Sequence, residues 1–135
     1  MTSIENKNPK LLIYSSNTLE RARRSLICSP FKLHLLEKMG NESVSVQAIA
    51  LASGVQNGYT QRPLSELAVE NELLWLIQVG VLRKEVDGQG ITDSYRLTPL
   101  GRQLVEQYGA TKSWGTPNWL DRFYNALSRL LRLPF

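Results

Sequence analysis

The sequence contains only one cysteine and one histidine among 135 residues. A single cysteine excludes an internal disulfide framework and a zinc site built from several thiolates, and a single histidine excludes a site with paired histidine ligands. A reducing, cytoplasmic environment is therefore expected. The apolar run Leu73–Ile77 is far shorter than the ~20 residues that cross a bilayer, and the polar stretch Met1–Lys10 lacks the apolar centre of a signal peptide. We expect neither a membrane span nor a secretion signal.

Motifs for catalysis or cofactor binding are also missing. His34 has no aspartate, cysteine or second histidine spaced to work with it, so it is expected as a solvent-exposed side chain. Cys28, at a helix end, is expected as a buried or half-buried structural residue. The segment Asp87-Gly88-Gln89-Gly90 has turn composition, and no phosphate-binding glycine pattern follows it. We expect no enzyme activity, no metal and no cofactor.

The composition, with 42% hydrophobic and 21% charged residues, is that of an ordinary globular protein, and the length fits one domain with an appended element. The net charge of +4 is distributed unevenly. Residues 1–40 carry seven basic and three acidic side chains, and residues 110–135 carry four and one, whereas residues 41–80 carry one and four. An anionic partner is therefore expected to meet the two ends of the chain first.

Periodicity and capping residues predict a mostly helical α+β domain with one hairpin. A polar lead covers residues 1–16, the domain covers 17–109, and residues 110–135 form a linker and an amphipathic helix. The expected helices cover 17–28, 30–40, 46–53, 63–79, 99–109 and 117–133, and the expected strands cover 81–86 and 91–97. The second half of helix 63–79 is apolar almost all round, which predicts that neighbouring elements cover it on several sides.

The segments Leu73–Glu85 (LLWLIQVGVLRKE) and Tyr95–Glu106 (YRLTPLGRQLVE) resemble parts of known regulators. The first looks like the end of a recognition helix that runs into the first strand of a wing. The second is similar to the second wing strand and closing helix of MarR-, PadR- and IclR-type proteins. With the order of the expected elements, they resemble the winged helix-turn-helix superfamily. That resemblance implies a winged-helix fold with additional helices at both ends, and binding of double-stranded DNA by a dimer.

The resemblance implies a non-enzymatic, DNA-binding protein similar to transcriptional regulators. Phosphate contacts are assigned to six basic side chains, namely Arg21, Arg23, Arg24, Arg83, Lys84 and Arg96. Base contacts are assigned to Gln61 and Arg62 at the start of the long helix, because N-terminal residues of such helices read base edges.

The long helix supports an alternative hypothesis, because it carries Glu66, Glu70 and Glu72 and no basic residue after Arg62. The phosphate rows on either side of the major groove repel each of these carboxylates. The alternative is a winged-helix protein-interaction module that does not bind DNA, in which the glutamates face a basic partner. In this alternative Trp119, Phe123 and Leu127 of the C-terminal helix supply an apolar docking face.

The C-terminal helix 117–133 has an apolar half and a polar half. The apolar side chains that are candidates for an interface are Trp119, Leu120, Phe123, Leu127 and Leu130. Three roles remain open for this helix. It closes the domain by covering helix 63–79, it pairs with a second copy in a homodimer, or it lies on a membrane surface, which is the least favoured of the three.

Overall fold

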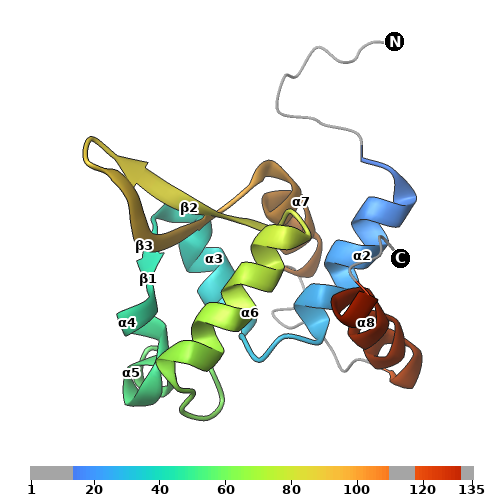
Figure 1. Ribbon diagram of the computed structural model, residues 1–135, viewed down its shortest axis with the longest axis horizontal. Coiled ribbons are helices and arrows are strands. Elements are labelled where there is room, and N and C mark those ends of the chain that lie inside the picture. Colours follow the sequence, from blue (N-terminus) through green and yellow to red (C-terminus); the bar gives the residue numbers. More distant parts are fainter. Residues whose placement is uncertain (1–13, 110–117, 132–135) are drawn as a thin grey trace.

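The computed structural model describes residues 14–109 and 118–131 (Figure 1). Within these residues the protein is α+β, with seven helices and one small antiparallel sheet, so the predicted fold class is confirmed at that level. The elements are α2 (Ser16–Ile27), α3 (Leu33–Asn41), β1 (Val44–Ser45), α4 (Val46–Ile49), α5 (Leu51–Gln56), α6 (Glu66–Gln78), β2 (Leu82–Asp87), β3 (Gly90–Leu97), α7 (Pro99–Gly109) and α8 (Trp119–Leu131). Most of the predicted polar lead and linker lies outside the described residues. None of the described helices combines the length and apolar character that crossing a membrane requires.

The sheet has the strand order β1-β3-β2, and both pairs are antiparallel. Strands β2 and β3 form the predicted hairpin, which projects away from the helices in Figure 1. Strand β1 was not predicted, because two residues are too few for an alternating pattern to show. Val44 pairs with Tyr95, while Ser45 pairs with Ser94 and also caps α4 by accepting a hydrogen bond from the Ala48 N–H.

The hydrophobic core lies where α3, α6 and α7 meet the sheet. Its largest fully buried side chains include Leu35, Leu36, Met39, Leu73, Leu76, Tyr95 and Leu104. They come from elements far apart in the sequence, which ties the hairpin to the helices that precede and follow it. Burial of apolar surface on this scale is the dominant favourable contribution to folding.

Helix α7 is confirmed within its predicted bounds, and its N-terminus is tightly held. Thr98 Oγ1 lies within hydrogen-bonding distance of the Gly80 and Val81 carbonyls and accepts from the Gly101 N–H. A Cβ at Gly101 would lie 2.3 Å from the Val81 carbonyl oxygen, so only glycine permits this close approach. Gly80 has a φ of +90°, a left-handed conformation that favours glycine just after the end of α6.

The second helix begins later than predicted. Pro30 is not its first residue, because Phe31 forms a bridge with Thr60 and the Lys32 N–H donates to the Tyr59 carbonyl at 2.8 Å. These contacts hold the segment extended until Leu33. The first helix begins at Ser16 and so slightly earlier than the predicted residue 17, because Ser15 caps it.

The predicted helix 46–53 is interrupted and becomes α4 and α5. The break lies at Ala50, and Leu51 has a φ of +58°, while its N–H donates to the Leu64 carbonyl at 2.7 Å. A tertiary contact therefore replaces a helical hydrogen bond here. No local signal in the sequence reports a hydrogen bond to a residue thirteen positions away.

Helix α6 begins at Glu66 and not at Pro63, because Ser65 caps it by accepting from the Ala68 N–H. It packs against α2, α4 and β2 and buries Val69, Leu73 and Leu76. The prediction that its second half has no solvent-facing side is wrong, since Leu74 is 50% exposed.

Candidate functional site

The outer face of α6 is acidic and apolar. Glu66 and Glu70 are exposed on it, and Leu67 and Leu74 beside them are also exposed. At 100° per residue these four side chains fall within one third of the helix circumference. The face therefore offers two carboxylates and two leucines, and it carries no basic residue.

Helix α5 adds two more exposed apolar side chains, Leu51 and Val55. Because the Leu51 N–H bonds to the Leu64 carbonyl, α5 is anchored beside the segment that leads into α6 (Figure 1). Solvent-exposed leucines on these helices are more typical of a protein-binding surface than of a surface that faces phosphates.

The structure does not place Gln61 and Arg62 on the long helix. Both are exposed, in the bend that precedes Ser65. The prediction that they form the start of the helix is corrected, because the cap at Ser65 moves the helix start to Glu66. The N-terminal turn of α6 therefore presents Glu66 and Leu67 instead.

The hairpin holds three of the predicted phosphate contacts, of which only Arg83 is fully exposed. Arg96 lies 3.5 Å from Glu85 and 3.3 Å from the Asn41 carbonyl. The Lys84 ammonium lies 5.7 Å from the centroid of the Tyr95 ring, and burial raises the pKa of Tyr95. Two of the three cations thus have partners within the chain.

Two of the three arginines of α2, Arg23 and Arg24, contact α8. Arg24 is only 6% exposed, and its guanidinium lies 5.5 Å from the centroid of the Tyr124 ring. Arg23 binds Glu20 and Asp121, which raises its pKa further and keeps it charged. The half-buried Arg21 has a buried Nε. The prediction of a phosphate clamp on α2 is corrected, because contacts with α8 and with Glu20 engage Arg23 and Arg24.

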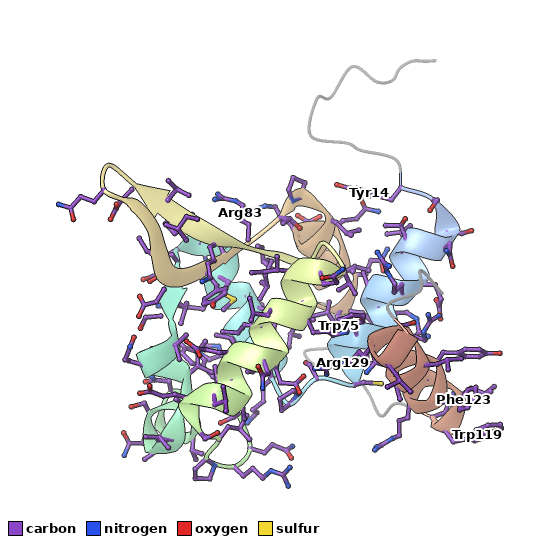
Figure 2. The ribbon with its side chains drawn as sticks, viewed as in Figure 1. Tyr14, Trp75, Arg83, Trp119, Phe123 and Arg129 are labelled. Carbon is purple, nitrogen blue, oxygen red and sulfur yellow. The ribbon has the colours of Figure 1, made fainter. Side chains whose placement is uncertain are left out.

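Helix α8 attaches to the domain through polar groups. Arg23 Nη2 donates to Asp121 Oδ1 at 2.8 Å, and Arg129 Nη1 donates to Glu72 Oε1 at 2.9 Å. The Arg129 guanidinium also lies 5.4 Å from the centroid of the Trp75 ring (Figure 2). We call this set of contacts between α8, α2 and α6 the polar seam.

Ser25 lies at the centre of the polar seam. Its hydroxyl accepts a hydrogen bond from Trp75 Nε1 at 3.0 Å, and it lies 3.3 Å from Asn125 Oδ1. It therefore links α6, α2 and α8 in one network. Ser128, fully buried nearby on α8, has no hydrogen-bond partner for its hydroxyl among the described residues.

The apolar half of α8 is turned outward. Trp119 and Phe123 point away from the rest of the molecule (Figure 2), and they are 72% and 53% exposed. Leu130 is 79% exposed, and Leu120 and Ala126 are exposed as well, whereas Leu127 is half-buried. Of the described α8 side chains only Asp121 and Ser128 are buried. The hypothesis that the apolar half covers the long helix is therefore wrong, since the polar half faces the domain.

Sequence reasoning missed the polar seam, and it assigned Glu72 to an external basic partner. That partner is Arg129 of the same chain. A signal was present, because Asp121, Asn125 and Ser128 lie at helical spacing and form a polar stripe. A stripe of short polar side chains can face a matching stripe as well as solvent, and the sequence does not distinguish the two.

Cys28 is half-buried and His34 is exposed. Burial raises the pKa of the Cys28 thiol, which favours the protonated, unreactive form. His34 is exposed, as predicted, and its ring lies 5.7 Å from that of Tyr59. Among the described residues no three histidine, cysteine or acidic side chains come together to hold a metal ion.

A family model described as Npun_F0494-like matches residues 12–129, so the chain belongs to the Npun_F0494-like family. No curated protein and no solved structure matches the chain. The matched range includes both α6 and almost all of α8, which places both exposed faces within the family's shared region.

Proposed function

We propose that this protein is a winged-helix module that binds a protein partner through α6, and not a reader of DNA sequence. The element order supports the winged-helix part of this proposal. Helix α3, strand β1, the α4–α5 pair, helix α6 and the β2–β3 hairpin follow one another, and β1 pairs with the distal strand β3. A winged helix with this element order uses α6 as its recognition helix and the hairpin as its wing.

The observation that carries the proposal is the acidic and apolar outer face of α6. A recognition helix lies between two rows of phosphates, where basic side chains release counterions and carboxylates are repelled. Glu66 and Glu70 are both exposed at that position, and no cation lies on the helix to offset them. Over residues 41–97 the chain carries seven acidic and four basic side chains, so the surrounding elements do not supply the missing positive charge.

The chemistry of this face defines the partner. Two carboxylates beside Leu67 and Leu74 are complementary to a protein segment that presents basic and apolar side chains on one face, such as an amphipathic basic helix. Leu51 on α5 is exposed as well, and its backbone is bonded to Leu64, two residues before α6 begins. Charge complementarity sets the orientation and the association rate, while the leucines provide the apolar contact area.

A titration with DNA tests the proposal that the protein does not bind DNA. The wild-type protein is expected to show no saturable binding to a mixed-sequence duplex of about two helical turns at about 50 mM NaCl, conditions that favour phosphate contacts. The charge-reversal variant Glu66→Lys/Glu70→Lys is expected to gain salt-dependent binding, because the repulsion is replaced by attraction. The control Glu42→Lys/Glu106→Lys adds the same charge away from α6 and is expected to gain little. Saturable wild-type binding that weakens with rising salt contradicts the proposal.

A titration with a model partner tests the interaction itself. The probe is a helical peptide with leucines at i and i+4 flanked by lysines, and the readout is the change in backbone amide shifts. Shifts are expected on α5 and α6 and are expected to disappear in Glu66→Lys/Glu70→Lys but not in the control. Absence of binding, or shifts confined to other elements, overturns the assignment of α6 as the binding face.

A further inference from the structure

We propose that the outward face of α8 pairs with α8 of a second copy of this chain, in an antiparallel arrangement about a twofold axis. The starting observation is that α8 turns its apolar half toward solvent. Asp121, Asn125 and Arg129 of α8 take part in the polar seam. Trp119, Phe123 and Leu130 on the opposite side are 72%, 53% and 79% exposed. This proposal concerns a different surface from α6, so the two succeed or fail separately.

The spacing of the exposed side chains is that of a helix–helix seam. Trp119, Phe123, Ala126 and Leu130 follow one another at intervals of four, three and four residues. This is the alternation of a and d positions by which two helices pack side by side. Leu120 and Leu127 lie along one edge of the same stripe, which widens the apolar contact.

The stripe is complementary to the same stripe on a second copy that runs in the opposite direction. With the twofold axis midway between Phe123 and Ala126, Phe123 of one copy lies opposite Ala126 of the other. The same axis places Trp119 opposite Leu130 of the second copy. Each large aromatic ring then faces a smaller side chain, which is how facing positions interdigitate without voids or clashes. A twofold interface requires this kind of self-complementarity.

The exposed area is close to what a dimer needs. Buried aromatic side chains each cover about 150–250 Å², so Trp119 and Phe123, at 72% and 53% exposure, offer on the order of 250 Å² per copy. Leu120, Leu130 and Ala126 raise the total to the order of 500 Å², against ~800 Å² per partner in a standard interface. An apolar patch of this size is at the upper end of what monomers expose.

Charges at the edge of the stripe permit the pairing. Antiparallel packing brings Arg122 of one copy toward Arg129 of the other, but Glu72 already neutralises Arg129 at 2.9 Å. Arg122 is the only fully exposed charged side chain among the described residues of α8. A helix that lies on an anionic membrane has several cations free for headgroups. The second copy therefore fits this face better than a lipid surface does.

The first test measures the mass of the full chain in solution by light scattering, over a dilution series from roughly 1 to 100 μM. The expected mass is twice the chain mass of 15.3 kDa at the upper end of the series. Phe123→Glu/Leu130→Glu is expected to be monomeric throughout. The control Ile91→Glu, which changes an equally exposed residue at the hairpin tip, is expected to remain dimeric. A monomeric wild type, or a Phe123→Glu/Leu130→Glu variant that stays dimeric, overturns the proposal.

The second test uses the size complementarity of the seam. Ala126→Phe brings two aromatic rings into conflict, so the dimer dissociation constant is expected to rise about tenfold or more. Phe123→Ala/Ala126→Phe exchanges the large and small partners and is expected to restore dimerisation. If the face instead binds lipid, Ala126→Phe adds apolar surface and strengthens binding to vesicles that mix zwitterionic and anionic lipids. That outcome, with no change in mass, contradicts the dimer.

Discussion

Helices α7 and α8 have similar sequence patterns, but they turn opposite faces toward the rest of the chain. Both carry apolar residues on one face at helical spacing, and both follow a Thr-Pro pair in the sequence. Helix α7 buries its apolar side chains Leu100, Leu104 and Val105 in the core, whereas α8 buries Asp121 and Ser128. An amphipathic pattern thus identifies which residues share a face, but it does not identify which face the rest of the chain covers.

The contacts that hold the two helices differ in kind. Helix α7 is held by apolar burial and by the close approach of Gly101 to the Val81 carbonyl. Helix α8 is held by the polar seam and by a reciprocal cap, in which the Asn118 and Asp121 side chains each accept from the other residue's N–H. Partly exposed ion pairs contribute less than buried apolar area does. Helix α8 is therefore the more weakly attached of the two, and its attachment depends on charge.

The largest expected difference between the helices is in the effect of shortening a leucine. Leu104→Ala on α7 is expected to lower the free energy of unfolding by about 2–5 kcal/mol, because it opens a cavity in the core. Leu130→Ala on α8 is expected to change it by less than about 0.5 kcal/mol in dilute solution, where the protein is monomeric. Urea unfolding at several protein concentrations checks both values. Equal losses at the lowest concentration would show that α8 also buries its leucine in the monomer.

A smaller effect is expected from breaking the polar seam. Arg23→Leu leaves the nearly buried Asp121 carboxylate without its cation, and the loss is expected to be about 1–2 kcal/mol after allowing for the 30% exposure of the Arg23 side chain. Hydrogen exchange is the sharper measurement, since the amides of α8 are expected to exchange faster while those of α7 remain protected. Arg62→Leu, which removes an exposed arginine, is the control. Unchanged exchange in α8 would contradict the role given to Arg23.

The smallest expected effect is on the stability of the folded protein at low pH. The hydrogen bond from Arg23 lowers the pKa of Glu20 below its usual 4.5, although partial burial opposes this. A carboxyl with a lowered pKa in the folded state contributes stability above its unfolded pKa and loses that contribution as the pH falls through the folded value. The urea concentration at the unfolding midpoint is therefore expected to decrease as the pH is lowered below about 4.5. The decrease is expected to be less steep in the Glu20→Gln variant. Matching pH profiles for the two proteins would contradict the stabilising role given to the Glu20–Arg23 pair.

Several features were predictable because their signals are local. Gly80 after an apolar run and Thr98-Pro99 before another one set the ends of α6 and α7, since a left-handed residue and a capped first turn depend on neighbours in sequence. The turn at Gly88 with β-branched runs on both sides predicted the hairpin for the same reason. The exposed side chains at Glu66 and Glu70 were likewise visible as a charge pattern that opposes DNA.

Other features depend on contacts between distant segments, and sequence reasoning placed them wrongly. The break at Leu51 depends on the Leu64 carbonyl, and the late start of α3 depends on Thr60 and Tyr59. The arginines on α2 look like a solvated cluster in the sequence, yet Tyr124 and Asp121 of a helix about 100 residues away engage Arg24 and Arg23. No spacing rule links residues so far apart.

By itself the sequence determined that this is a mostly helical α+β chain, where its main helices and hairpin lie, and which residues of each helix share a face. Hydrogen bonds to near neighbours and side-chain periodicity decide these properties. Only the tertiary structure decided which face of α8 is turned inward. That choice depends on whether arginine, serine and glutamate groups on α2 and α6 meet matching polar groups on α8, and those groups become neighbours only after the chain has folded.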